Sequence, residues 1–285
     1  MSFRIGKRRF HWLGLLTLGY IAWSLMPVLI AVMFSFNEGR SRTNWTGFSL
    51  RWYLEDPERS VLHDPTMHTA LLHTMRLGLI VTLITVPLGV MLALGLDRWR
   101  GRIPAGANLL VIMSFVLPEI LLAVALLFVA TTLSTPLELG LVGQVMGLVT
   151  FQLSYPVVIV RARMLAIGPQ YEQAAIDLGA TPLGAVRRVL LPMLLPAIFA
   201  STVLVFADVI DDFVLVRYLS GDASTEPVSV KIYNTARAAP TPALNALATL
   251  VLAASLLAVV LGFLAYKFFS RGERDVGVES FTRDL

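Results

Sequence analysis

The sequence contains no cysteine, and this absence excludes disulfide bonds and thiol-ligated metal sites. Charged residues are scarce, at 15% of 285 residues, whereas a typical soluble domain has about 25%. No segment fits the phosphate-binding pattern G-x-x-x-x-G-K-[ST], so we expect no ATPase site in this chain. Neither G-x-S-x-G nor H-E-x-x-H occurs, and we predict no catalytic residue and no metal site.

Most residues of the chain are apolar. Hydrophobic residues make up 56% of the chain, and its mean hydropathy is +0.73. These values predict an all-α integral membrane protein, a single transmembrane domain over residues 1–285. The six stretches long enough to cross a bilayer are about 11–36, 69–96, 107–131, 140–160, 194–216 and 242–268. We interpret the first as a retained span, since it is too long for a signal peptide.

The distribution of Lys and Arg predicts the orientation of these spans. Most of the 23 basic residues fall in segments that six spans would place on one side, together with both termini. The positive-inside rule assigns that side to the cytoplasm, which explains the net charge of +4 without a nucleic-acid partner. Residues 37–67 and 217–241 are then external. The inner basic residues are Arg4, Lys7, Arg8, Arg9, Arg98, Arg100, Arg102, Arg161, Arg163, Arg187, Arg188, Lys267, Arg271, Arg274 and Arg283.

The cytoplasmic segment 161–193 has clear helix punctuation. Pro169 suits the start of a helix and Gly179 the residue just past its end. Thr181 and Pro182 then fit an N-cap and a first-turn proline, which predicts a second helix running to Pro192. A short helix, a glycine break and another helix on the cytoplasmic side form a surface that a cytoplasmic partner could bind.

This segment resembles the loop found in permease subunits of bacterial ABC importers. The family pattern is Glu-Ala-Ala, three residues, Gly, nine residues and Ile-x-Leu-Pro, and Gln173-Ala174-Ala175, Gly179 and residues 189–192 fall at those spacings. The family's glutamate is replaced by Gln173, and the nearest carboxylate is Glu172. One residue is about 100° of rotation on a helix, so the salt bridge of the family glutamate is in doubt here.

The resemblance implies partners as well as a fold. It implies a homologous second permease, a dimer of ABC ATPases that binds ATP and Mg, and an extracytoplasmic substrate-binding protein, in a bacterial inner membrane. This chain itself would bind no cofactor. The loop would contact the ATPase through Glu172, Gln173, Ala174, Ala175, Asp177 and Gly179.

Other stretches are similar to the second permease subunit of spermidine/putrescine importers. They include FSFN at 34–37, NWTGFSLRWY at 44–53, and residues 209–214 and 230–233. The resemblance implies a polyamine as the transported substrate. A permease for another small solute, such as an amino acid, a sugar or iron, is the alternative. An ATP-independent secondary transporter would show inverted repeats, and no convincing repeat is found.

Four acids within the predicted spans are candidates for the substrate pathway. They are Glu119 in the third span and Asp208, Asp211 and Asp212 in the fifth. An aspartate at the bilayer centre costs about 2.5–3.5 kcal/mol, so such residues usually face a polar interior. The aspartates are three and four residues apart and can lie near one helix face, where they would suit a cation with spaced ammonium groups.

Two aromatic residues, Phe213 and Tyr233, could stack on such a cation. The alternative for the acids is structural: they are solvated at the outer interface, or they pair with Arg76 or Arg217. The alternative for the aromatics is packing.

Three histidines, His63, His68 and His73, are spaced five residues apart. Five residues rotate a helix by about 140°, so these side chains do not share a face as zinc ligands would. We expect them in the loop and at the membrane interface.

Overall fold

The computed structural model describes residues 12–41, 43–57, 59–99, 101–132, 138–238 and 241–269. Within these ranges the chain is helical apart from its turns and a single bridge between Asn37 and Phe48, so the predicted all-helical class is confirmed. Several predictions lie outside the described residues. These are the basic residues Arg4, Lys7, Arg8, Arg9, Arg100, Arg271, Arg274 and Arg283.

Five described helical segments are long and apolar enough to cross a membrane, or six if one bent pair counts as a span. The five are Trp12–Ser35, Pro65–Arg98, Leu141–Ile167, Pro182–Asp211 and Pro242–Leu264. The elements are α1 Trp12–Ser35, η1 Arg51–Glu55, α2 Pro65–Arg98, α3 Arg102–Val116, α4 Glu119–Thr132, α5 Leu141–Gln152, α6 Ser154–Ile167, α7 Gln170–Asp177, α8 Pro182–Ala185, η2 Val186–Leu190, α9 Leu191–Asp211, α10 Val214–Leu219, η3 Ala223–Thr225, α11 Val228–Ala238 and α12 Pro242–Phe269.

The chain forms two compact units. The first comprises the described parts of residues 1–64 and 235–249, and the second those of 65–234 and 250–285. In the first unit, α1 buries only Phe34 and Ser35 at its end and exposes apolar side chains along the rest of its length. Such a helix suits a lipid environment, where apolar surface carries no cost.

The turn after α1 in the first unit is organised around Asn37 and Trp52. Trp52 is fully buried, and its Nε1 donates to the carbonyl of Asn37 at 2.6 Å. The Asn37 amide donates to the carbonyls of Ser41 and Asn44, both at 3.0 Å, while its oxygen accepts from the N–H of Thr46 at 2.9 Å. The two stretches FSFN and NWTGFSLRWY are therefore two sides of one hydrogen-bonded turn.

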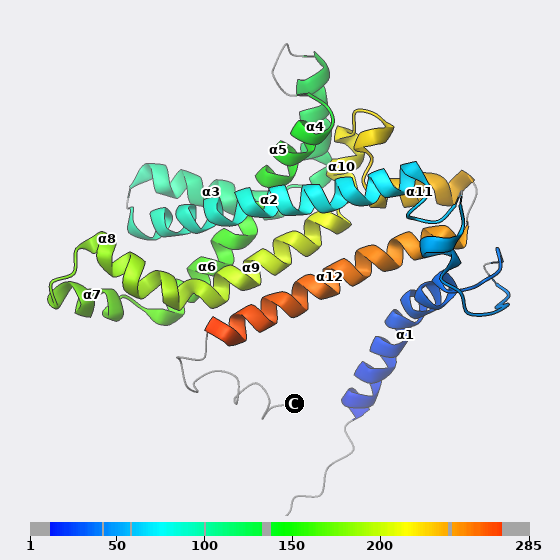
Figure 1. Ribbon diagram of the computed structural model, residues 1–285. Coiled ribbons are helices and arrows are strands. Elements are labelled where there is room, and N and C mark those ends of the chain that lie inside the picture. The colour runs from blue at the N-terminus through cyan, green and yellow to red at the C-terminus, as the bar shows by residue number, and fades with distance from the viewer. Residues whose placement is uncertain are drawn as a thin grey trace, which may run out of the picture. The chain divides into compact units, whose positions relative to one another are not determined.

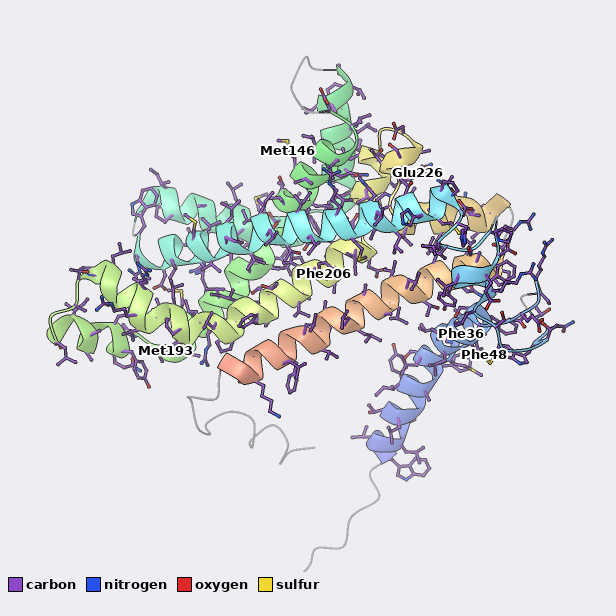
Figure 2. All side chains as sticks on the ribbon, in the orientation of Figure 1. Phe36, Phe48, Met146, Met193, Phe206 and Glu226 are labelled. Atoms are coloured by element: carbon purple, nitrogen blue, oxygen red, sulfur yellow. The ribbon has the colours of Figure 1, made fainter. Side chains whose placement is uncertain are left out.

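Aromatic rings cover this turn. Phe36 stacks on Phe48 with ring centroids 5.3 Å apart, and on Tyr53 at 5.2 Å. Figure 2 shows Phe36 and Phe48 close together beside α1. The Tyr53 hydroxyl donates to Ser35 Oγ at 2.6 Å and so joins the turn to the end of the helix.

The core of the second unit lies where α2, α6 and α9 meet. Figure 1 shows α2 running along α9, and both helices contact α6. Two glycines on α2 allow the close approach. A Cβ at Gly89 would lie 2.3 Å from Pro156 Cγ of α6, and one at Gly78 would lie 2.6 Å from Ile210 Cγ2 of α9. Figure 2 shows Phe206 of α9, whose ring also borders Gly78, between these two helices.

The expected third span is two helices rather than one. α3 and α4 meet at Leu117 and Pro118 with a bend of 106°. Proline has no N–H for the helical hydrogen bond, and it disfavours helical geometry in the residue before it. Leu117 is accordingly extended, with ψ 127°. Beyond the bend, α4 packs against α5 and α10 (Figure 1).

The expected fifth span also ends early. α9 stops at Asp211, and Asp212 is extended before α10 begins. The Asp212 carboxylate accepts from the N–H of Val216 at 3.2 Å, in the manner of a helix cap. The chain therefore breaks at a residue that sequence analysis singled out for its charge.

The segment 161–193 has the predicted helix, glycine break and second helix. α7 is followed by Gly179 at φ +91°, a backbone conformation that favours glycine. Thr181 Oγ1 accepts from the N–H of Gly184 at 3.1 Å and caps α8. The predicted end at Pro192 is wrong, because the helix continues through the π turn η2 into α9. In this turn the N–H of Leu191 bonds to the carbonyl of Val186, five residues earlier. The helix therefore continues through Pro192, which has no N–H to donate.

Candidate functional site

A polar cluster forms in the second unit at the level where the third and fifth predicted spans break. Glu119 is the first residue of α4, Gln152 the last of α5, and Asp208 and Asp212 lie at the end of α9. The amide Nε2 of Gln152 donates to Asp208 Oδ2. The side chains of Asp212 and Glu119 are hydrogen-bonded to each other. Tyr155 of α6 lies close enough for Glu119 and Asp208 to act on it electrostatically. We call these five residues the acidic cluster.

Several polar atoms at this level are buried and have no hydrogen-bond partner among the described residues. Two of them belong to the acidic cluster, Glu119 Oε1 and Gln152 Oε1, and two are the hydroxyls of Thr82 and Thr85 on α2. These threonines lie between Gly78, which contacts α9, and Gly89, which contacts α6. A buried acceptor without a donor costs about 1–3 kcal/mol. The unpaired oxygens therefore favour a ligand that brings hydrogen-bond donors.

The electrostatic character of the acidic cluster is negative. The charged groups that act on Asp212 are Glu119 and Asp208, both acids. Carboxyl groups that lie this close together repel each other when they are ionised, so the pair favours an added positive charge. Between described residues the salt bridges are Arg51–Asp56 and Arg98–Glu172, and neither involves the cluster.

The structure thus brings together three of the four predicted acids. Asp211 is exposed, and its carboxylate makes no hydrogen bond or salt bridge to a described residue. The predicted aromatics do meet: Phe213 and Tyr233 have ring centroids 4.9 Å apart, tilted by 52°. Ser229 of the same helix as Tyr233 donates to the Asp212 carbonyl at 2.6 Å, which places α11 beside the break.

Four further residues of this region were not predicted from the sequence: Gln152, Tyr155, Thr82 and Thr85. Each is polar within an otherwise apolar span, and Gln152 is fully buried. An amide in a span is a weaker signal than a carboxylate, but it carries the same expectation of an internal partner.

The expectation that His73 is an interface residue is wrong. His73 is buried within α2, and its Nε2 lies 2.7 Å from Gln144 Oε1. The Gln144 amide nitrogen donates to the carbonyls of Val216 and Thr225, at 3.3 and 2.9 Å, and to Ser220 Oγ at 3.1 Å. This buried network joins α2, α5, α10 and η3. Histidine fits here because its ring supplies the donor that a buried amide oxygen requires.

The second predicted site, on α7, presents apolar side chains, the amide of Gln173 and the exposed carboxylate of Asp177. Gln173 and Ala174 are exposed, and the two leucines that flank the glycine break, Leu178 and Leu183, are 89% and 77% exposed. Glu172 instead forms a salt bridge with Arg98 at the end of α2. The carboxylate next to the family's glutamate position is therefore used within the chain, whereas Asp177, one helical turn after Gln173, is exposed.

A groove of about 600 Å³ lies between α9 and the later part of α12. Its walls are apolar and include Phe199, Val203, Leu204 and Phe263. None of the acidic cluster lines it, so the groove and the cluster are separate features.

Comparison with known proteins gives consistent results for sequence and fold. The family model described as "Binding-protein-dependent transport system inner membrane component" matches residues 85–275. The putrescine transport system permease protein PotI of Escherichia coli K12 is 32% identical over 253 residues, 87% of each chain. The spermidine/putrescine transport system permease protein PotC of Haemophilus influenzae is 31% identical over 243 residues, which cover 85% of this chain and 91% of that protein.

Solved structures resemble this chain in fold at low sequence identity. A chain of a bacterial ABC transporter for import of the acidic polysaccharide alginate has a TM-score of 0.68 at 17% identity, covering 92% of this chain and 96% of that one. A chain of the MetNI methionine ABC transporter has a TM-score of 0.56 at 20% identity, covering 72% and 94%.

Proposed function

This chain belongs to the family of binding-protein-dependent transport system inner membrane components, and we propose that it forms half of the pathway for polyamines such as spermidine and putrescine. Membership makes it a multi-pass inner-membrane permease subunit of an ABC importer. The polyamine substrate is supported by relatives at about 30% identity that are named for putrescine and spermidine transport. The observation that carries the proposal is the acidic cluster at the breaks of the third and fifth predicted spans.

The chemistry of the acidic cluster suits an ammonium group. Each ammonium brings three donors and no acceptor, and Glu119 Oε1 and Gln152 Oε1 are buried acceptors without described donors. A hydrogen bond to a charged group contributes about 1.5–3 kcal/mol. The alkyl segments between ammonium groups would pass the Phe213–Tyr233 pair, whose ring faces also attract cations.

The acids are best tested as a matched set. Asp208→Asn combined with Asp212→Asn should reduce uptake of labelled spermidine at least about tenfold, the effect of losing one charge-assisted hydrogen bond. Asp211→Asn should leave uptake close to normal, since Asp211 lies outside the cluster. Abundance of each variant in the membrane controls for insertion and assembly. Equal uptake by the double variant and the native chain would remove the cluster from the pathway.

Competition experiments separate the polyamine proposal from the alternative solutes. Unlabelled putrescine should inhibit uptake, while an amino acid, a sugar or an iron chelate should not. Replacing ATP by a non-hydrolysable analogue in the reconstituted complex should abolish accumulation. Accumulation without hydrolysis would instead indicate an ATP-independent transporter.

The second part of the proposal concerns α7. It would be cytoplasmic, with segment 161–193, and would dock on an ABC ATPase that binds ATP and Mg as one of two copies. Exposed Leu178 and Leu183 supply apolar contact area, and Gln173 can hydrogen-bond where the family glutamate would form a salt bridge. ATP must favour one state of the assembly through contacts that differ between states, and this loop would make those contacts.

The remaining partners follow from the same proposal. A homologous second permease would complete the pathway, and an extracytoplasmic substrate-binding protein would deliver the polyamine to external segments 37–67 and 217–241. Both termini would be cytoplasmic, with residues 1–285 forming one permease domain. Labelling of single introduced cysteines tests this orientation, because the native chain has none. A cysteine at Gly179 should react only from the cytoplasm, and one at Asp222 only from outside.

A further inference from the structure

The cytoplasmic end of α2 is joined to α7 by an ion pair. Arg98 lies in the last turn of α2, and its Nη2 contacts Oε1 of Glu172, in the first turn of α7. The two residues are 74 positions apart. Their side chains are 41% and 23% exposed, so the pair is partly shielded from solvent. Glu172 also suits its place electrostatically, because a helix N-terminus favours negative charge.

The direction of Glu172 differs from that of its neighbour. Gln173 is exposed, whereas Glu172 is partly buried against Arg98. Consecutive residues on a helix point about 100° apart, so the two side chains face different surfaces. The carboxylate one step before the family's glutamate position therefore serves this chain and not a partner.

The chain on either side of α7 passes through a glycine. Gly168 precedes the helix at φ +77° and Gly179 follows it at φ +91°. A Cβ at Gly179 would meet no atom within 4 Å, so nothing packs against that pivot. α7 also packs on α8 and η2, which continue into α9. The ion pair is a direct side-chain link from α7 to a second long helix of the core, α2.

We propose that the Arg98–Glu172 pair transmits movement of α7 to α2. α2 packs on α5, α6 and α9, the helices that carry Gln152, Tyr155 and Asp208 of the acidic cluster. Movement of its end would thereby reach the substrate pathway without passing through the glycine pivots. Arg98 and Glu172 are positioning residues, and the inference rests on the proposed function, in which α7 contacts the ATPase.

The test measures polyamine taken up per ATP hydrolysed in the reconstituted complex. A partly exposed ion pair contributes little to stability, so Arg98→Gln and Glu172→Gln should fold and assemble. Each should keep ATP hydrolysis within about twofold but lower uptake per ATP about fivefold, at the low end of measured coupling between sites. The exchanged pair, Arg98→Glu with Glu172→Arg, should recover at least half of the native ratio. Asp97→Asn, the exposed neighbour of Arg98, is the matched control and should behave as the native chain.

Three results would overturn the inference. An unchanged ratio in both single variants would show that the pair transmits nothing. Failure of the exchanged pair to recover the ratio would show that Arg98 and Glu172 act separately. Loss of the ATPase from the complex in Glu172→Gln but not in Arg98→Gln would assign Glu172 to the partner. Failure of the proposed function is seen separately: Leu178→Asp should release the ATPase, and its retention would overturn both the docking proposal and this inference.

Discussion

Replacing Gln144 by leucine tests whether its buried network holds the ends of α2, α5 and α10 together. Gln144 is fully buried and takes part in four hydrogen bonds. Ser220 Oγ also donates to the carbonyls of Val216, at 2.6 Å, and Thr225, at 3.3 Å, so both carbonyls keep a partner in the variant. The ring N–H of His73 keeps none. One stranded donor costs about 1–3 kcal/mol, and each of the two hydrogen bonds that the two amide hydrogens can make contributes about 0.5–1.5 kcal/mol, so we expect a loss of about 2–6 kcal/mol.

Thermal unfolding of the purified chain in detergent measures this loss, and hydrogen exchange locates it. Exchange should rise in α10 and η3, while α7 should be unaffected because it lies outside the network. The control is a double-mutant cycle with His73→Phe, which removes the stranded donor. The coupling should be about 1–3 kcal/mol and should make the double variant less destabilised than the sum of the two singles.

Two results would refute this reasoning. A change below about 0.5 kcal/mol for Gln144→Leu is typical of a surface position and would mean that the network is absent or hydrated. Additive effects in the cycle would mean that His73 does not depend on Gln144.

Three further predictions concern glycines and a capping residue. Gly89→Leu should destabilise the second unit by about 1–3 kcal/mol or more, since its Cβ would meet Pro156 at 2.3 Å. Gly95→Ala should be neutral or slightly stabilising, because a Cβ there meets no atom within 4 Å. The free energies of unfolding of the two variants measure this contrast. Gly179→Ala should lower uptake per ATP without preventing insertion, because the left-handed backbone costs a non-glycine residue about 1–2 kcal/mol, and normal coupling would contradict this. Hydrogen bonds from Ser224, and then Thr225, lower the pKa of Asp222. Its capping contribution should therefore persist at neutral pH and be lost only as the pH falls through this lowered pKa. The loss should appear as faster amide exchange at Ser224 and Thr225. In Asp222→Ala these two amides should exchange fast at every pH.

Local physics explains why some features could be predicted from the sequence. The length of an apolar run is enough to predict a membrane helix, because the bilayer sets the length required. The cap at Thr181 and the break at Gly179 depend on residues within one turn, and both were found as predicted. The resemblance of segment 161–193 to the family loop also followed from residue spacing, with Gln173 as its departure from the pattern.

Packing decided what the apolar pattern could not. Spans such as α3 and α4 are apolar around their whole circumference, so hydropathy does not indicate which face turns inward. Glu119 and Asp212 are far apart in the sequence, and their contact depends on the 106° bend at Leu117 and Pro118. His73 acquired its role only because Gln144 of another helix faces it.

Glu172 shows, at a single residue, the difference between what the sequence determines and what tertiary structure determines. Its spacing marks it as the carboxylate beside the position where the family has glutamate, and the sequence alone determined that much. That it turns to Arg98 was decided by tertiary structure, because a step of one residue on a helix changes direction by about 100° and only the packed neighbours determine what lies there. The sequence thus determined the apolar segments, the helix punctuation of segment 161–193 and the family, while the assembly of the acidic cluster and the link from α7 to α2 required contacts between distant residues.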